Sequence, residues 1–178
     1  ASPGTLESQL VVAANPMYPE LVKVLDVPFK QIGAILPAIT QEQFEQLPAI
    51  KAKAFLNRVY DIEYLTKEQI IAMEPNINPE VKGGLHIPRE SIIDPFILVQ
   101  ALAENANENG VDFLLNTKVT GIQTENGKIK AVETTAGIIE TGYVINAAAL
   151  YCDEIAAMVG KADYKVVARR GQFYILDK

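Results

Sequence analysis

The sequence predicts an α/β (α+β) fold arranged in two lobes. Its 178 residues are 49% hydrophobic and 21% charged, which is enough for one sizeable core or for two small lobes that share one. In the second half, short alternating runs separated by turn residues predict a three-stranded β-meander between helices. In the first half, apolar residues at helical spacing surround a few strand-like runs.

The first half is expected to begin with helices. Residues 5–26 carry apolar side chains at helical spacing, and Asn15-Pro16 divides this stretch into two helices. Thr40 and Thr66 are suitable N-caps for later helices. The expected elements that follow are a buried strand over 29–39, short helices over 41–47 and 48–58, an extended segment over 60–65, a helix ending at Met73, and a strand over 81–88.

The second half has clearer signals. Asp94 as N-cap and Pro95 at the first helical position begin a helix, and Asn109-Gly110 ends it. Asn126-Gly127 between two alternating runs is a strong β-hairpin signal. The expected elements after this helix are strands over 111–115, 118–124, 128–135 and 138–143, a buried strand over 144–149, a helix over 151–159, and a strand region over 164–175.

Composition excludes several functional classes. The formal net charge of −6 argues against nucleic acid as the main partner and against an anionic membrane surface. The longest apolar runs are far too short for an integral membrane segment. One cysteine rules out an internal disulfide and fits a cytoplasmic, reducing compartment. One histidine rules out a multi-histidine metal site within a single chain, and no metal is predicted.

No motif identifies a function by itself. The glycines never form G-x-G-x-x-G, there is no P-loop lysine, and no local serine, histidine and acid signature is present. Composition and spacing alone therefore predict an α/β domain. A non-enzymatic α/β binding module without a cofactor stays an alternative.

The order of several short motifs carries more information. The motifs are, in order, Ser2-Pro3-Gly4-Thr5-Leu6, Glu74-Pro75-Asn76, Gly84-Leu85-His86-Ile87-Pro88, Asp94-Pro95-Phe96, Asn146-Ala147-Ala148-Ala149-Leu150 and Arg170-Gly171-Gln172-Phe173-Tyr174. This series resembles the FAD-dependent oxidoreductases of the D-amino-acid oxidase superfamily, in the branch of glycerol-3-phosphate dehydrogenase and L-2-hydroxyglutarate oxidase, over almost the whole chain.

The resemblance implies an internal fragment of a two-domain flavoenzyme. Residues 1–90 would be a portion of the substrate (cap) domain with N-terminal helices, and the antiparallel sheet of that domain would lie in this part. Residues 91–162 would be a partial FAD-binding domain with the β-meander, and residues 163–178 a return strand of the substrate domain. The glycine-rich dinucleotide-binding unit of the family is missing from the sequence. We therefore expect that the ends are not natural termini, and that the fragment is inactive and binds FAD weakly or not at all.

The resemblance also implies which residues contact FAD. Val119 matches a position where the backbone lies against the adenosine half of FAD, although it also fits an ordinary strand valine. Ala147, Ala148, Ala149 and Leu150 match an Asn-Ala-Ala-Gly stretch that passes close to the cofactor, because small side chains permit that approach. Ala149 replaces the glycine, which brings a positive φ at this position into question. The alternative is a tightly packed strand-to-helix turn.

Three residues are candidates for substrate binding. Arg170 and Tyr174 match the strand that lines the substrate cavity, where an arginine holds a phosphate or carboxylate through paired hydrogen bonds. The alternative for both is an exposed strand with basic ends. His86 is the only imidazole and a possible base, although the family does not require histidine there. Cys152 reads as a small packed residue or a reactive thiol, and no catalytic residue is assigned.

By this resemblance, the full-length enzyme would oxidise glycerol 3-phosphate to dihydroxyacetone phosphate, with FAD as cofactor. Electrons would pass to an acceptor such as a quinone. The alternative substrate is L-2-hydroxyglutarate or another 2-hydroxy acid, so a small anionic 2-hydroxy substrate is expected in either case. The expected location is cytoplasmic, with membrane association of the full-length enzyme left open.

Overall fold

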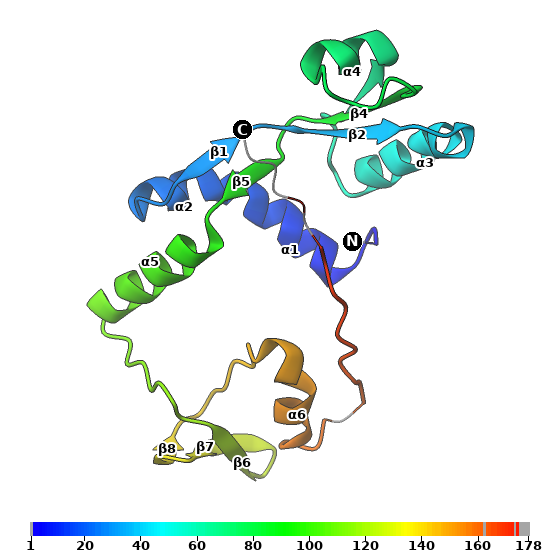
Figure 1. Cartoon of the computed structure of the whole chain (residues 1–178). Coiled ribbons are helices and arrows are strands. Elements are labelled where there is room, and N and C mark those ends of the chain that lie inside the picture. Colours follow the sequence, from blue (N-terminus) through cyan, green and yellow to red (C-terminus); the bar gives the residue numbers. More distant parts are fainter. Residues whose placement is uncertain (1, 162, 173, 175–178) are drawn as a thin grey trace. The chain divides into compact units, whose positions relative to one another are not determined.

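The computed structural model describes residues 2–161, 163–172 and 174. The chain forms two compact units, Ala1–Val111 and Asp112–Lys178, which are described one at a time below (Figure 1). The structure confirms the mixture of helices and small sheets that the sequence predicts.

The chain begins with the predicted pair of helices. Helix α1 (Leu6–Ala14) is followed by a 3-10 turn, η1 (Asn15–Met17), and by α2 (Tyr18–Val24). The Thr5 hydroxyl caps α1 by accepting a hydrogen bond of 3.2 Å from the Ser8 backbone N–H. The expected division at Asn15-Pro16 is confirmed, because proline has no N–H for a continuous α-helical ladder.

The single strand expected over residues 29–39 is wrong, since the structure divides it into β1 (Phe29–Gln31) and β2 (Ala34–Ala38). Between them Gly33 has a φ of +69°, a left-handed conformation that cannot continue an extended ladder. β1 pairs antiparallel with β5 (Ser91–Ile93), a three-residue strand that was not predicted.

Helix α3 (Gln41–Leu56) is one element where two helices are predicted. Proline inside a helix costs about 3 kcal/mol relative to alanine, and this cost is the reason for expecting a new helix at Pro48. In the structure the helix continues through Pro48, and Leu47 is buried in the core beside it. Thr40 and Gln43 form a capping box at its start, so the predicted N-cap is confirmed.

Strands β2, β4 (Gly83–Ile87) and β3 (Glu63–Thr66) form an antiparallel sheet with β4 at its centre. Helix α4 (Lys67–Met73) follows β3 directly, and Thr66 caps it as predicted. The strand expected over 81–88 is confirmed as β4, and the extended segment over 60–65 contains most of β3.

Two consecutive glycines allow helices to pack on both faces of β4. A Cβ atom on Gly83 would lie 2.7 Å from the Phe44 ring of α3, and one on Gly84 would lie 3.1 Å from Ile70 of α4. Successive residues of a strand point to opposite faces, so α3 covers one face and α4 the other (Figure 1). The core on the α3 side contains four buried side chains, Ala38, Leu47, Ile62 and Leu85.

A bidentate ion pair between Arg89 and Asp61 joins the segment before β3 to the turn after β4. Arg89 Nε donates to Asp61 Oδ2 at 2.6 Å, and Arg89 Nη2 donates to Oδ1 at 2.9 Å. Mainly because of this hydrogen bonding from Arg89, the pKa of Asp61 lies below its ordinary value of 3.8. Both side chains stay about 40% exposed, so water screens the pair.

Helix α5 (Pro95–Glu108) closes the first unit as predicted. Asp94 Oδ1 accepts hydrogen bonds from the backbone N–H groups of Phe96 and Ile97, and Pro95 takes the first helical position. Gly110 follows the helix with a φ of +87°, the conformation expected of a glycine at a helix C-terminus.

The second unit contains the predicted meander. Strands β6 (Val119–Glu125), β7 (Lys128–Thr134) and β8 (Gly137–Glu140) pair antiparallel in chain order. Asn126 and Gly127 both have positive φ, as the predicted two-residue hairpin turn requires. A 3-10 turn, η2 (Ala149–Tyr151), leads into α6 (Cys152–Ala157), which confirms the helix expected in this region.

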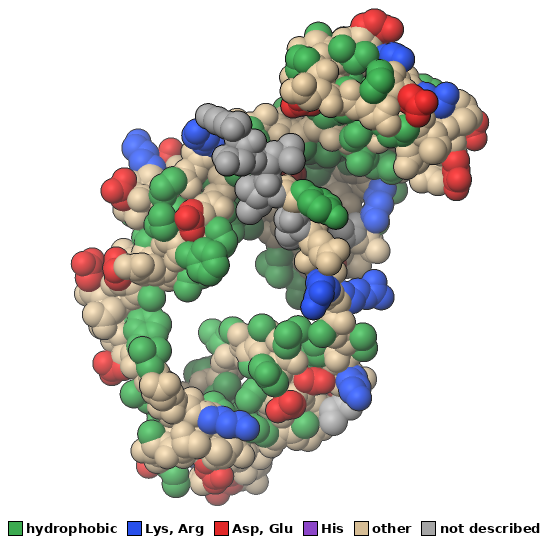
Figure 2. Space-filling model, viewed as in Figure 1, with side chains coloured by type: hydrophobic (Ala, Val, Ile, Leu, Met, Phe, Trp, Pro, Cys, Tyr) green, Lys and Arg blue, Asp and Glu red, His purple; other side chains and the backbone are tan. Residues whose placement is uncertain are grey.

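Three strands expected in the second half are wrong. Residues 111–115 and 144–148 are irregular and Ala149 begins η2, while the described residues of 164–175 are also irregular. Phe173 and Ile175 lie outside the described residues. A continuous apolar run becomes a buried strand only when other strands flank it, and none of the described strands pairs with these segments. Their side chains are exposed instead, with Leu115 at 80% and Ile145 at 92%, and hydrophobic atoms are visible on the surface of both units (Figure 2).

The packing on β4 predicts that Gly84→Ala destabilises the first unit. The new Cβ would lie 2.6 Å from the Leu36 carbonyl oxygen, a backbone atom that cannot move alone. We expect a loss of about 2–4 kcal/mol in the free energy of unfolding, measured by urea titration. Gly142→Ala is the control, because no atom lies within 4 Å of its Cβ position and its φ is not left-handed. Equal effects of the two substitutions would contradict this account.

The Asp61–Arg89 pair predicts a pH-dependent contribution to stability. A carboxyl group whose pKa is lower in the folded than in the unfolded chain stabilises the fold above its unfolded pKa, and loses this effect as the pH falls through its folded pKa. We expect Asp61→Asn to lower the free energy of unfolding at pH 7 by at most about 1 kcal/mol, since the pair is partly exposed.

The difference between Asp61→Asn and the unsubstituted chain should shrink below about pH 4, where the carboxyl group of the unfolded chain is already protonated. Urea titrations at pH 7, 5 and 3 measure this. Glu125→Gln is the matched control. Because the Lys130–Glu125 pair is more exposed, this substitution should change the free energy of unfolding less than Asp61→Asn does. A difference that grows on acidification is the opposite of the expected result.

Candidate functional site

His86 lies at a cavity in the first unit. The cavity has a volume of about 410 Å³ and is lined by residues of β2, β4 and the end of α4, with Glu74 as its other ionisable side chain. His86 is half-buried on β4, between Ile35 of β2 and Glu63 of β3. A Cβ atom on Gly33 would lie 3.1 Å from His86 Nε2, so the glycine leaves room for the ring. The cavity therefore presents an imidazole and a carboxylate to a small molecule.

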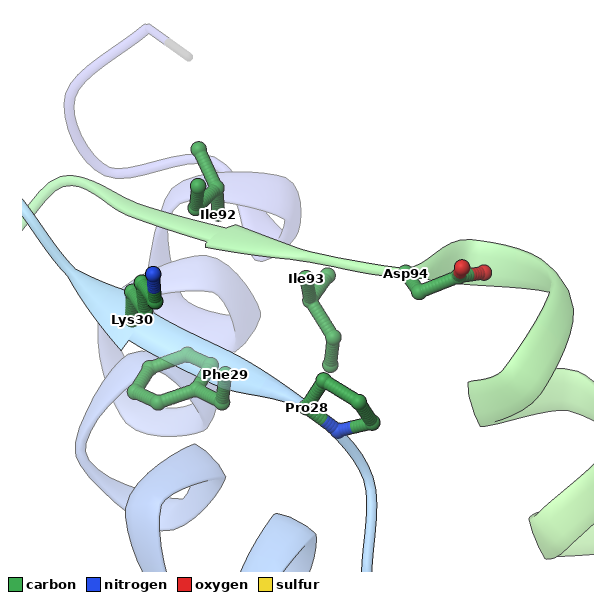
Figure 3. Close-up of a pocket in the computed structure, with 6 residues that line it drawn as sticks. All are labelled: Pro28, Phe29, Lys30, Ile92, Ile93 and Asp94. Atoms are coloured by element: carbon green, nitrogen blue, oxygen red, sulfur yellow. The ribbon is translucent and has the colours of Figure 1, made fainter.

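A second cavity of about 460 Å³ lies along the β1–β5 ribbon and is mostly apolar. Figure 3 shows Ile93 pointing toward Pro28 and Asp94 at the start of α5. In the described part of the chain, Lys30 is its only other charged lining residue, and one oxygen of Asp94 already caps the helix. With so few polar groups available, this cavity offers apolar contact rather than acid–base chemistry. None of its lining residues is predicted as a site from the sequence.

The predicted cofactor stretch forms a tight turn in the second unit. Asn146 holds it at both ends: its Nδ2 donates to the Cys152 carbonyl at 2.7 Å, and its Oδ1 accepts from the Ala148 N–H at 3.3 Å. Ala149 has a φ of +48°, so the left-handed conformation exists although alanine replaces glycine. Such a residue costs about 1–3 kcal/mol and persists where its surroundings hold it, often at functional sites.

Small side chains leave the backbone of this turn accessible. Ala147 and Ala149 are exposed, and no side chain in residues 147–149 is larger than a methyl group. The first N–H groups of the 3-10 turn have no acceptor within that turn. A ligand can therefore approach the backbone closely. Asn146 stands in the sequence motif, but its two hydrogen bonds are not predicted from the sequence. They form only when the turn brings Ala148 and Cys152 to the Asn146 side chain.

Val119 is the first residue of β6 and is half-buried, where it pairs with Thr134 of β7. It belongs to the same compact unit as the turn of Ala147–Leu150. This placement is compatible with the predicted backbone contact and also with an ordinary strand valine.

The structure does not place Arg170 and Tyr174 in a strand. Both are exposed, Tyr174 at 94%, and the segment before them is irregular. This segment is fastened to α6: the Val166 N–H donates to Asp153 Oδ2 at 3.0 Å, and the Tyr164 hydroxyl donates to the Cys152 carbonyl at 3.2 Å. The hydrogen bond from Val166 is the main reason that the pKa of Asp153 is lowered.

Two further observations limit the chemistry of the described residues. They contain no group of three or more histidine, cysteine, aspartate or glutamate side chains that could hold a metal ion. Among the helices in this part of the chain, none combines the length and the hydrophobicity needed to cross a membrane.

The strained turn predicts that Ala149→Gly stabilises the second unit. Glycine adopts a positive φ without the Cβ strain, although part of the gain is lost to the greater freedom of the unfolded chain. We expect an increase of about 0.5–1 kcal/mol in the free energy of unfolding, measured by urea titration. Ala148→Gly is the matched control and should destabilise, because Ala148 has a φ of −79°. A loss of stability in Ala149→Gly would contradict the assigned strain.

Comparison with known proteins shows what this chain is similar to. The family model described as DAO, FAD dependent oxidoreductase, matches residues 2–178. A glycerol 3-phosphate dehydrogenase from Caloramator mitchellensis is 37% identical over 178 residues, which are 100% of this chain and 37% of the relative. An L-2-hydroxyglutarate dehydrogenase from Indibacter alkaliphilus is 26% identical over 99% of this chain and 44% of the relative.

Among solved structures, L-alpha-glycerophosphate oxidase from Mycoplasma pneumoniae with FAD bound has a TM-score of 0.76 and 28% identity, over 89% of this chain and 43% of that one. The chain thus spans less than half the length of these relatives. Because the family model matches nearly every residue, the chain belongs to the DAO family of FAD-dependent oxidoreductases.

Proposed function

We propose that this chain is part of a flavin-dependent dehydrogenase that oxidises glycerol 3-phosphate to dihydroxyacetone phosphate. The observation that carries the proposal is the 37% identity to a glycerol 3-phosphate dehydrogenase over the whole chain. The structural similarity to L-alpha-glycerophosphate oxidase, at a TM-score of 0.76, supports it. An acceptor such as a quinone would take the electrons, and the enzyme would work in the cytoplasm or at a membrane surface.

The turn at Ala147–Leu150 is the part of the chain that fits FAD best. Its left-handed Ala149 and exposed small residues let the cofactor approach the backbone, and the side chain of Asn146 holds the turn in this form. Val119 would add a backbone contact from the same compact unit. When bound, FAD supplies the acceptor for the hydride that leaves the substrate carbon. The residues of this turn position the cofactor.

His86, Arg170 and Tyr174 are proposed for the substrate. Arg170 would hold the anionic end of a 2-hydroxy substrate through charge-assisted hydrogen bonds, and Tyr174 would supply a polar tip in an apolar wall. The half-buried imidazole of His86 lines a cavity of about 410 Å³, which supports contact with a small molecule. There it would accept a proton from a substrate hydroxyl group.

The proposed domains follow from the same family. Residues 1–90 would belong to the substrate domain, residues 91–162 to the FAD-binding domain, and residues 163–178 would return to the substrate domain. The compact units divide at Val111/Asp112, so α5 belongs with the first unit by its contacts. The proposed boundary refers to the longer protein.

A 2-hydroxy acid is the second candidate substrate. The L-2-hydroxyglutarate dehydrogenase from Indibacter alkaliphilus matches 99% of this chain at 26% identity, which is lower than the identity to the glycerol 3-phosphate dehydrogenase. Both substrates carry an anionic group and a secondary hydroxyl, so the same arginine chemistry would serve either. The binding module without a cofactor is the third reading, and membership of an FAD-dependent family argues against it.

The proposal predicts a difference between this chain and a longer one. We expect that the 178-residue chain, titrated with FAD, shows no stoichiometric change in the visible flavin band or in flavin fluorescence, and oxidises no 2-hydroxy substrate. A chain extended to the length of the relatives should bind FAD and turn over glycerol 3-phosphate in preference to L-2-hydroxyglutarate. Preference for L-2-hydroxyglutarate would make it the first candidate substrate and glycerol 3-phosphate the second. Absence of FAD binding in the extended chain would overturn the proposal.

A further inference from the structure

A cavity of about 550 Å³ in the first unit lies where β3 meets the start of α4. Phe44 and Leu47 of α3 and Tyr64 and Leu65 of β3 form its apolar walls, and buried Gly84 of β4 also lines it. It shares no lining residue with the cavity beside His86. Neither the family resemblance nor the proposed function assigns it a role.

Its two aromatic rings present large exposed surfaces. Phe44 is 40% exposed and Tyr64 is 51% exposed. The Phe44 ring lies directly against β4, because a Cβ atom on Gly83 would come within 2.7 Å of Phe44 Cε2. The glycine thus determines where the ring sits. Two rings at one cavity offer a surface to which a flat apolar group can bind.

Three lysines lie at the cavity or beside one of its rings. Lys67 and Lys82 line the cavity, and Lys51 Nζ lies 4.5 Å from the centroid of the Tyr64 ring, within the range of a cation–π interaction. Neither of the ion pairs found among the described residues involves any of these lysines. Since the whole chain carries a net charge of −6, this group of cations runs against the average charge of the protein.

Among the described residues, Glu68 is the only acidic one that lines the cavity. Hydrogen bonds from its own backbone N–H and from the Thr66 hydroxyl, with the nearby charge of Lys67, hold the pKa of Glu68 below its ordinary value. The first two of these contacts direct its carboxylate toward the start of α4. Two lysines against one carboxylate among these lining residues, with Lys51 beside the Tyr64 ring, leave the cavity with an excess of positive charge.

We propose that this cavity binds a small aromatic anion, a flat ring that carries a carboxylate or a phosphate group. The ring would lie against Phe44 and Tyr64, and the anionic group would face Lys67 and Lys82. Apolar walls with a few charged groups at the edge are the usual composition of a small-molecule site. The proposal does not depend on the proposed function, since it uses no cofactor and no residue assigned to the reaction.

The test is a titration of the 178-residue chain with naphthalene-2-carboxylate, followed by ¹H–¹⁵N NMR. We expect saturable shifts of the Gly83 and Gly84 amide signals. Lys67→Gln and Lys82→Gln should each raise the Kd about two- to five-fold, the effect of one partly exposed charge pair. Lys53→Gln is the matched control: this exposed lysine lies on α3 but does not line the cavity, so its Kd should not change.

Three related probes separate the contribution of the aromatic ring to binding from that of the negative charge. The neutral naphthalene-2-carboxamide should bind more weakly than the carboxylate, and acetate should give no saturable shift. The doubly charged 2-naphthyl phosphate should bind more tightly, and its advantage should fall as salt is added. Spectra of each variant without ligand verify that it is folded. Equal affinity for carboxylate and carboxamide, equal effects of Lys82→Gln and Lys53→Gln, or no shift at Gly83 and Gly84 would each overturn the proposal.

Discussion

The close packing of two helices on one strand is the constraint on which the first unit depends. β4 is the central strand of its sheet, and the missing side chains of Gly83 and Gly84 let α3 and α4 approach opposite faces of it. Leu85 follows directly and is fully buried in the core on the α3 side. The next residue on the α4 side is His86, so the same register that builds the core also brings the imidazole to its cavity.

The second unit depends on a smaller constraint. It has little buried hydrophobic surface, and Ala131 is the single residue of its described part that belongs to the buried core. Hydrogen bonds therefore contribute to its order, in the ladder of β6, β7 and β8 and in the side-chain contacts of Asn146 around the turn and of Asp153 with Val166. A left-handed alanine held by an asparagine side chain shows that the turn is kept in a form that the residue alone does not favour.

The exposed apolar segments at 111–115 and 144–149 fit membership of a longer protein. Their sequence has the pattern of buried strands, while the described strands leave them unpaired. Relatives of the family are more than twice as long as this chain.

Local sequence signals were sufficient where a structure depends on neighbours in the chain. The caps at Thr40, Thr66 and Asp94 and the Asn126-Gly127 hairpin are confirmed, because their hydrogen bonds and dihedral angles involve residues only a few positions apart. The order of short motifs also identified the family, which the match over residues 2–178 shows.

Tertiary structure alone decided the rest. The break between β1 and β2 at Gly33, the continuation of α3 through Pro48 and the pairing of β5 all depend on contacts between segments far apart in the sequence. The cavity beside His86 likewise gathers residues from two strands and a helix. The sequence by itself determined the local elements and the family, while strand partners and cavities were decided by packing, because their energy comes from contacts that only the folded chain makes.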